Sequence, residues 1–458
     1  MKNRLFDALR ASRADYTEIR LERSWATTVA YRGRRLEGAS AGLDCGGFVR
    51  CLNRGRGWGI VSFTSIGRLP SMVARAHEMS LSVPVDEPIR LAPIPVRQED
   101  VRDDLDGDVR GIPLEEKQAL LERLNGEMFG VDRRIVDTQA AYHDEVTEYW
   151  FGNSDGVLIH ELRPEVSLSA VAVAVEHGII ERGLESIGLR RGWISIQARE
   201  ELFLRAARRA IALLHASRIR SGTYPVVLDP KLAGVFVHET IGHLSEADFL
   251  AQNHEAGALM TPGRRVGSPE LNVGDDGSAA GRRGTLPYDD EGTPTQNTLL
   301  VQNGVLVGRL HSRETAARMG QRPTGNARAL SFRHPPIVRL SNTYIANGKG
   351  TFEDLIRDIK LGVYACDALG GRAHLEDYSF TSGYAHMIRD GKVAEIVKPA
   401  TLAGKLFETL DRIDRIGGDF RWNEMGGGCG KGGQAPLPVG EGAPHVRIRD
   451  MRVGGELA

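Results

Sequence analysis

The stretch Val237-His238-Glu239-Thr240-Ile241-Gly242-His243 decides how the rest of the chain is interpreted. A histidine, an adjacent glutamate and a second histidine shortly after them on one helix are a common way for a hydrolase to hold zinc. The imidazoles bind the metal and the glutamate activates water. The stretch therefore predicts a metallopeptidase site built on a helix.

The spacing of the two histidines differs from that of the usual zinc helix. Residues i and i+4 lie about 40° apart around an ideal α-helix, whereas residues i and i+5 lie about 140° apart. His238 and His243 have the second spacing. A single π-helical turn would bring both onto one face, and Gly242, as a poor helix former, lowers the cost of that distortion. We expect a bulged or broken helix here.

The residues before this stretch predict how the helix begins. Val226, Val227 and Leu228 form a short apolar strand, and Asp229-Pro230 has the residue types preferred at the N-cap and at the first helical position. The helix is therefore expected to start near Pro230. Its other residues are mostly apolar, so two buried histidines would be costly there without a metal.

The third ligand is left open by the residues themselves. Glu246, Asp248 and His254 follow closely in sequence, and Cys429 lies far away in the glycine-rich run 426–434. A thiolate is a strong zinc ligand, and the glycines around it would let the backbone approach the metal closely.

Several motifs resemble the TldD/PmbA family, in particular the TldD-like branch that keeps the metal motif. They are the histidine stretch, Arg339-Leu-Ser-Asn342-Thr-Tyr-Ile, the segment from Lys360 to Gly383, and Gly-Cys429-Gly-Lys-Gly-Gly-Gln434. The resemblance runs over nearly the whole chain. It implies a zinc-dependent peptidase with one zinc per chain, ligands His238, His243 and Cys429, and Glu239 as catalytic base. Glu246 and Asp248 would then orient a ligand histidine.

The resemblance also implies the substrate and the assembly. Substrates would be unfolded or flexible peptides, and free strand edges would suit an extended peptide bound through its main chain. The chain would form a dimer, either with itself or with a PmbA/TldE-like subunit that lacks the metal. Candidate donors to the oxyanion are His311, His386, Tyr378 and Tyr384.

Two other functions are alternatives to the peptidase. The family has been described as a modulator of DNA gyrase, which would make this chain a regulatory protein with structural zinc. A structural site normally has four protein ligands and has no need of Glu239. A thiol redox function of Cys429 is disfavoured because no second cysteine lies nearby in sequence.

Composition excludes some classes of protein. The 458 residues carry a formal net charge of −1, which gives no support to a surface for nucleic acid or anionic membrane. No apolar run is long enough to span a membrane, and the first twenty residues lack the apolar core of a signal peptide. We therefore expect a cytoplasmic protein. Four cysteines, Cys45, Cys51, Cys366 and Cys429, are too few for a disulfide framework.

The predicted fold class is α+β, with a mixed N-terminal α/β region followed by a β-rich C-terminal catalytic domain that carries the metal helix. The predicted segments are an α+β subdomain over 1–81, a proline-rich connector over 82–112, a second α+β subdomain over 113–221 and the metallopeptidase domain over 222–458. Cys45 and Cys51 are expected to be ordinary sheet or turn residues, and Cys366 a core residue.

Local patterns predict the elements of these segments. Helices are expected over 3–12, 67–80, 113–128 and 199–219, and strands over 135–142, 145–151, 157–162 and 166–176, with two more strands in 16–32. Hairpin turns are expected around 53–57 and at Asn303-Gly304, Asn347-Gly348 and Asp390-Gly391. The polar segment 263–295 is expected to be either a loop that orders over substrate or a disordered stretch, and it lacks EF-hand spacing for calcium.

Overall fold

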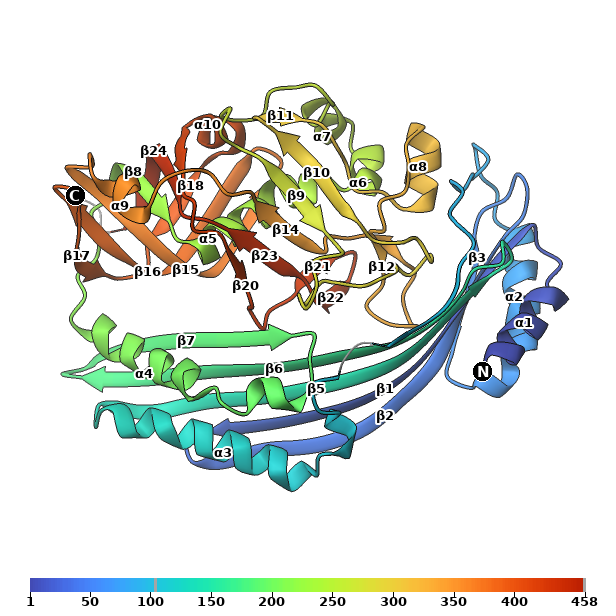
Figure 1. Cartoon of the computed structure of the whole chain (residues 1–458), viewed down its shortest axis with the longest axis horizontal. Coiled ribbons are helices and arrows are strands. Elements are labelled where there is room, and N and C mark those ends of the chain that lie inside the picture. The colour runs from blue at the N-terminus through green and yellow to red at the C-terminus, as the bar shows by residue number, and fades with distance from the viewer. Residues whose placement is uncertain (103–104, 456–458) are drawn as a thin grey trace.

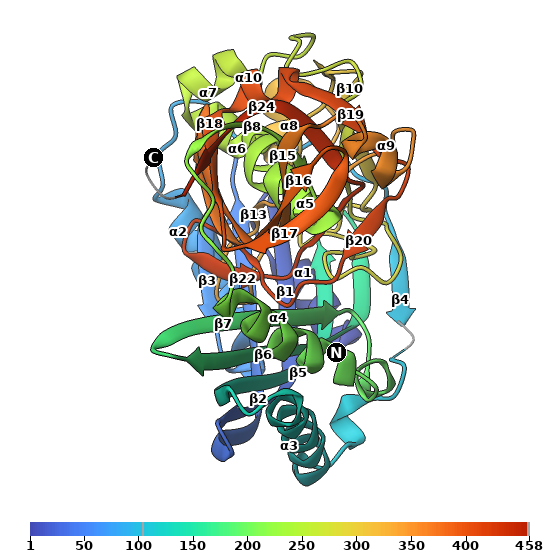
Figure 2. The same cartoon turned by 90° about the vertical axis from the view of Figure 1, so that its left-hand side faces the viewer.

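The computed structural model describes residues 1–102 and 105–455. Figure 1 shows a long curved sheet from the N-terminal part of the chain and a β-rich C-terminal part that lies along it, and Figure 2 shows the same stacking after a turn of 90°. The fold class is α+β, as predicted. Residues 103–104 of the predicted connector and 456–458 of the predicted last segment lie outside the described residues.

In the described residues, the N-terminal sheet has the strand order β3-β2-β1-β5-β6-β4, and β7 also pairs with β6. The strands are β1 (Tyr16–Arg32), β2 (Arg35–Leu52), β3 (Gly59–Phe63), β4 (Gln98–Arg102), β5 (Ile135–Asn153), β6 (Leu158–Glu176) and β7 (Ile179–Leu189). All pairs are antiparallel except β4 with β6. The predicted segments 1–81 and 113–221 thus contribute strands to one shared sheet.

These strands are longer than predicted, because residues taken as breaks continue the ladder. Residues 16–32 form the single strand β1, and the two strands predicted on each side of 143–144 form the single strand β5. Asp144 is buried within β5, where the Lys117 ammonium lies 2.7 Å from its carboxylate. In β6, Pro164 falls between the segments that β4 and β7 cover, a place where a residue without an N–H is tolerated.

Helices pack against this sheet at its two ends. They are α1 (Lys2–Ala11), α2 (Leu69–Leu81), α3 (Leu114–Val131) and α4 (Glu200–Leu214). α1 and α2 lie at one end of the sheet, and α3 and α4 lie near β5, β6 and β7 (Figure 1). α4 ends at Leu214, five residues before the predicted end, and a short link leads to the C-terminal part.

The C-terminal part contains two larger sheets in the described residues. One has the order β11-β10-β9-β14-β23-β20, and the other has the order β15-β8-β24-β18-β16-β17, with β19 paired to β24. The bounds are β8 (Gly222–Leu228), β9 (Val273–Asp276), β10 (Asn297–Gln302), β11 (Val305–Leu306), β12 (Ala327–Arg328), β13 (Ile337–Val338), β14 (Asn342–Ile345), β15 (Leu361–His374), β16 (Asp377–Arg389), β17 (Lys392–Val397), β18 (Thr401–Lys405), β19 (Ile413–Ile416), β20 (Arg421–Asn423), β21 (Cys429–Lys431), β22 (Gln434–Leu437), β23 (Gly440–Ala443) and β24 (Val446–Gly454).

Six α-helices of this part are α5 (Pro230–Val237), α6 (Ala247–Gln252), α7 (His254–Leu259), α8 (Arg313–Met319), α9 (Phe352–Ile356) and α10 (Leu406–Asp411). α5 packs against β23, β15 and β14, so the metal helix lies between strands of both sheets. Its apolar residues belong to the largest core cluster of the chain.

Two of the three predicted Asn-Gly or Asp-Gly hairpins are present. Asn303-Gly304 joins β10 to β11 and Asp390-Gly391 joins β16 to β17, each with positive φ at both residues. The prediction for Asn347-Gly348 is wrong. The strand before it, β14, pairs with β9 and in parallel with β23, so no hairpin follows there.

The segment 263–295 is largely irregular, as expected of a loop, apart from β9. β9 lies inside a sheet, and Asp275, Asp289, Asp290 and Glu291 are all buried. These carboxylates accept hydrogen bonds from backbone N–H groups or from arginines, so the acidic residues are part of the packed interior. Asp290 and Glu291 pair with Arg163 and Arg50 of the N-terminal sheet, and these pairs join the two layers.

Candidate metal centre

The metal helix begins as the sequence predicts. β8 ends at Leu228, and the carboxylate of Asp229 accepts a hydrogen bond from the N–H of Leu232 at 2.7 Å. Pro230 occupies the first turn of α5. The second oxygen of Asp229 accepts from the N–H of Asp367 at 3.0 Å, so the cap also ties the helix to β15.

The helix changes to π-helical form at the histidines. Residues His238–Gly242 form the π-turn that the spacing predicted. Gly242 lies close to Leu340. A Cβ at this position would be 3.1 Å from the Leu340 side chain, so a larger residue would have little space there. The turn places both imidazoles on one side of the helix, with ring centroids 5.2 Å apart and ring planes nearly perpendicular at 86°.

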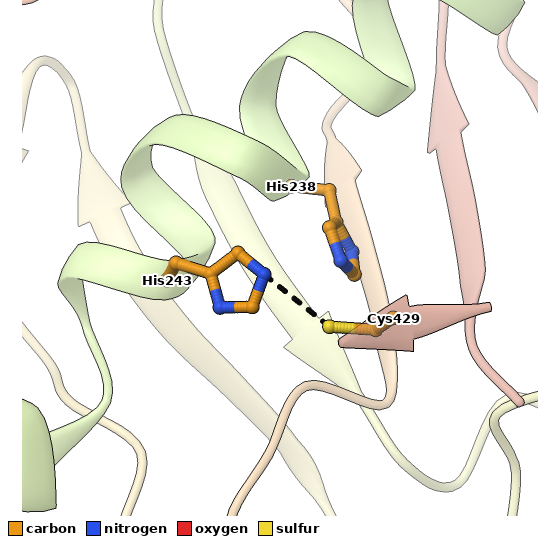
Figure 3. Close-up of side chains that lie close together, drawn as sticks. All are labelled: His238, His243 and Cys429. Atoms are coloured by element: carbon orange, nitrogen blue, oxygen red, sulfur yellow. Dashed lines mark hydrogen bonds between the residues drawn. The ribbon is translucent and has the colours of Figure 1, made fainter. Parts of the chain in front are cut away.

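Cys429 completes the group. Figure 3 shows its side chain pointing from β21 toward both histidines. The Sγ atom lies 3.2 Å from Nε2 of His243, and one ligand atom from each of His238, His243 and Cys429 lies within 4.8 Å of the others. Tetrahedral zinc with ordinary Zn–N and Zn–S bonds separates its ligand atoms by about 3.3–3.6 Å, so this set needs only small adjustments to fit the ion.

Further side chains fix which nitrogen each histidine presents to the group. Nδ1 of His243 lies 3.1 Å from the carboxylate of Glu246. Nδ1 of His238 lies 3.4 Å from Oγ1 of Thr343, whose hydroxyl donates to Asp275 at 3.0 Å. Both Nε2 atoms are therefore left for a metal.

In the described part of the chain, the other three candidates for the third ligand do not join this group. Glu246 contacts His243 through Nδ1, as expected of an orienting residue. Asp248 instead pairs with Lys431 at 2.7 Å and accepts from the N–H of Val338, so its expected contact with a ligand histidine is absent. His254 is exposed at the start of α7.

Comparisons with known proteins identify relatives along the whole chain. Three consecutive models of the PmbA/TldA metallopeptidase match the chain: domain 1 over residues 17–80, the central domain over 107–214 and the C-terminal domain over 221–455. A metalloprotease of Synechocystis is 42% identical over 98% of this chain and 96% of its own length. The chain belongs to the PmbA/TldD metallopeptidase family. A more distant relative, 28% identical over 96% of this chain and 97% of its own length, is named a zinc metalloprotease TldD homolog of Saccharolobus solfataricus.

Solved structures share the fold of this metallopeptidase. TldE of Thermococcus kodakarensis matches with a TM-score of 0.79 at 17% identity, over 99% of this chain and 100% of that one. A Thermotoga maritima protein named as a candidate modulator of a DNA gyrase also has a TM-score of 0.79, at 21% identity and with 99% of each chain covered. At these identities the likeness concerns the fold.

The surroundings of Cys429 in this candidate metal group favour a thiolate. Burial alone would raise the pKa of the Cys429 thiol, but hydrogen bonds and charge from His238 and His243 lower it to about 4. Burial alone would lower the pKa of both histidines, and their contacts with Cys429 raise it instead, helped at His243 by Glu246. Cys429 is thus ready to bind a metal ion as the thiolate at neutral pH.

A buried arginine holds the cysteine in place. Arg339 is fully buried, and it donates to the carbonyl oxygen of Cys429 at 2.7 Å and to that of Gln434 at 3.1 Å. These bonds hold the short hairpin of β21 and β22 that carries Cys429. Arg339 stood in a quoted motif of the sequence, yet nothing in that motif indicated which backbone it would bind.

A cavity of about 220 Å³ opens beside the metal group. Glu239 lines it with one third of its side chain exposed, and its carboxylate lies 3.9 Å from Nε2 of His243. The remaining walls are mostly apolar or glycine: Val235, Ala368, Leu369, Gly370, Gly371, Met425, Gly427, Gly428 and Val439, with Glu441. The exposed glycine backbone offers N–H and C=O groups to a ligand.

The predicted oxyanion donors do not reach this cavity. Within the described residues, none of His311, His386, Tyr378 and Tyr384 is among its lining residues. Tyr378 bonds to Thr409 and His311 bonds to Gln321, each inside the C-terminal core. Their sequence positions carried no information on which strand face they would occupy, and this expectation is wrong.

A larger cleft of about 770 Å³ lies between the two layers of the molecule. β1, β2, β5 and β6 form one side, and residues 328–332 and 436–438 form part of the other. It lacks the metal group but shares the segment 425–429 with the smaller cavity, since Gly426 lines the cleft and Met425 lines the cavity. The cleft is thus a neighbour of the metal centre.

The remaining cysteines are as expected. All four are free, Cys45 and Cys51 lie on β2, and Cys366 is buried. In the described part of the chain, no helix is long and apolar enough to cross a membrane.

Proposed function

We propose that this chain hydrolyses peptide bonds in unfolded or flexible peptides, with one zinc ion held by His238, His243 and Cys429 and with Glu239 as general base. The observation that carries the proposal is the convergence of these three side chains at a cavity lined by Glu239. Zinc bound there would polarise the scissile carbonyl and make the attacking water more acidic. Three protein ligands leave a fourth position open, which is the pattern of catalytic rather than structural zinc.

The roles of the chain's own residues follow from their places. Glu239 accepts a proton from the attacking water and passes it to the leaving amine. Glu246 and Thr343 hold the two imidazoles with Nε2 directed at the metal position. Backbone groups of Gly370, Gly371, Gly427 and Gly428 in the cavity wall would hold a peptide through its main chain, which suits unfolded substrates.

We also propose a dimer in the cytoplasm, formed with a second copy or with a metal-free subunit of the PmbA/TldE kind. The fold shared with TldE supports the second arrangement. The cleft between the layers would then be the route by which an extended peptide approaches the metal centre.

The test is digestion of a panel of unstructured peptides by protein of known zinc content, beside Glu239→Gln. We expect cleavage by the unaltered protein and a loss on the order of 1000-fold or more in the variant at unchanged zinc content, because the general base is removed. Glu255→Gln, an exposed acid on α7, is the matched control and keeps full activity.

Two results would change the proposal. Zinc without cleavage, both alone and with a metal-free family subunit added, would favour the regulatory function named for the gyrase-modulator relatives. Full activity in Glu239→Gln would remove Glu239 from its role.

A further inference from the structure

A second carboxylate lies in the metal cavity and has no role in the chemistry above. Glu441 is on β23, where it pairs with Thr343 of β14 on one side and Asn423 of β20 on the other. Only 8% of the residue is exposed, and it lines the cavity together with His238, Glu239 and Cys429.

The carboxylate of Glu441 has no hydrogen bond or ion pair with any residue that the structure describes. The charges of His238 and Arg283 influence it without an ion pair, and Arg283 is already paired with Glu165. Two other buried acids have cationic partners: Glu18 pairs with Arg50 and Asp290 with Arg163. A carboxylate in the wall of a narrow, mostly apolar cavity, without a partner in the protein, points to a partner that arrives from outside.

The packing around Glu441 does not require a charged side chain at this position. A Cβ on Gly234 of α5 would lie 3.0 Å from Cβ of Glu441, so the glycine lets the helix lie close over β23. Val235 and Val439 line the same cavity, and an apolar residue at position 441 would extend that wall. Packing therefore does not explain a glutamate.

The charges of the cavity favour a cationic partner. Glu239 and Glu441 both line this cavity, and none of its described lining residues is a lysine or an arginine. In such a confined space a charge-assisted hydrogen bond between a carboxylate and a cation is stronger than in water.

We propose that Glu441 binds a cationic group of the peptide next to the scissile bond, either the ammonium or guanidinium of a Lys or Arg side chain or a free α-amino group. The inference rests on the proposed peptidase function and adds a preference for one charge to a site that otherwise holds the main chain. Glu441 is thus a specificity-determining residue in the wall of the metal cavity.

Peptide binding tests this without turnover. The zinc-loaded Glu239→Gln protein is titrated with fluorescent peptides that differ by Lys against norleucine at one position, or by a free against an acetylated N-terminus. We expect at least one cationic peptide to bind about 10-fold more tightly than its neutral match, and the ratio to fall to about 1 when Glu441→Gln is added. Weaker binding after Lys is replaced by norleucine assigns the contact with Glu441 to the Lys side chain. Weaker binding after acetylation assigns the contact to the α-amino group.

Two variants control for indirect effects. Glu424→Gln removes the same charge nearby from a half-exposed residue that pairs with Arg282, and it keeps the ratio. Glu441→Asp keeps the charge on a shorter side chain, and it should retain part of the preference for the cationic peptide. Both are compared with Glu441→Gln in zinc content and unfolding midpoint.

Other outcomes would overturn the inference. If the Glu239→Gln protein binds charged and neutral peptides equally, and the unaltered protein cleaves both, the role of Glu441 is rejected. The proposed peptidase function then remains in place. Loss of zinc from Glu441→Gln at an unchanged unfolding midpoint of the metal-free protein would make Glu441 a ligand instead. Absence of all cleavage by the zinc-loaded unaltered protein, with cation-dependent binding intact, would reject the proposed function alone.

Discussion

The N-terminal sheet and the metal centre are built in opposite ways. The sheet consists of long regular strands, of which β5 and β6 have 19 residues each, held by continuous backbone ladders and by two apolar clusters under four helices. The metal centre has a distorted helix and strands of three or four residues, held by single side chains such as Asp229, Glu246 and Arg339. The stability of the sheet is thus spread over many contacts. In the metal centre, the positions of the site residues depend on a few individual contacts.

The largest contrast is expected for a cysteine in each region. Cys429→Ser should lower zinc affinity and reduce cleavage by on the order of 1000-fold or more, because a neutral hydroxyl replaces a thiolate ligand. Cys45→Ser, on the regular strand β2 and only partly buried, should change neither. Zinc content and peptide cleavage are measured for both. Full zinc binding in Cys429→Ser would remove this residue from the metal centre.

A core substitution in the sheet should act on stability alone. Leu168 of β6 is 1% exposed, and Leu168→Ala should lower the free energy of unfolding by about 2–5 kcal/mol through lost burial and a cavity. Zinc stoichiometry and cleavage below the unfolding temperature should stay as they are. Val136→Ala, at an exposed position of β5, is the control, and it should change the free energy of unfolding by about 0.5 kcal/mol or less. A large fall in zinc affinity with little loss of stability would contradict the separation of the two regions.

The orienting carboxylate should have a moderate effect confined to the metal. Glu246→Ala removes the partner of Nδ1 of His243, and we expect about 10- to 100-fold weaker zinc binding. Asp248→Ala is matched to it, since both acids pair with Lys431 but only Glu246 contacts a histidine. Competition with a zinc chelator gives both affinities. Equal losses in the two variants would show that Lys431, rather than the imidazole contact, matters.

The smallest effect is a pH dependence at the start of the metal helix. Burial raises the pKa of Asp229 to about 6, above its usual 3.8, although backbone hydrogen bonds oppose the shift. The folded protein then holds this proton more tightly than the unfolded chain, so stability falls as pH rises from about 4 to about 6. A shift of about two pKa units limits the loss to at most about 3 kcal/mol.

Asp229→Asn keeps an N-cap oxygen and removes the titration. Urea unfolding of both proteins across this pH range should therefore show a steeper decline with rising pH in the unaltered protein. Identical slopes would assign the titration elsewhere.

Much of the metal centre was predicted from the sequence because its signals are local. The π-turn follows from the five-residue spacing of His238 and His243 and from Gly242, and the helix start follows from Asp229-Pro230. Both depend on backbone geometry within a few residues of the chain. Strand continuity was harder, because the buried Asp144 inside β5 is paired with Lys117, which comes from a different element.

The sequence by itself thus determined the α+β class, the metal helix and its distortion, and through its motifs the family to which the chain belongs. Only the tertiary structure decided that Glu246 rather than Asp248 holds His243, that Arg339 pins Cys429, and that Glu441 enters the cavity without a partner. The physical reason is that these contacts join residues from separate elements. Local propensity sets each element, whereas the packing of α5 between two sheets sets which side chains meet.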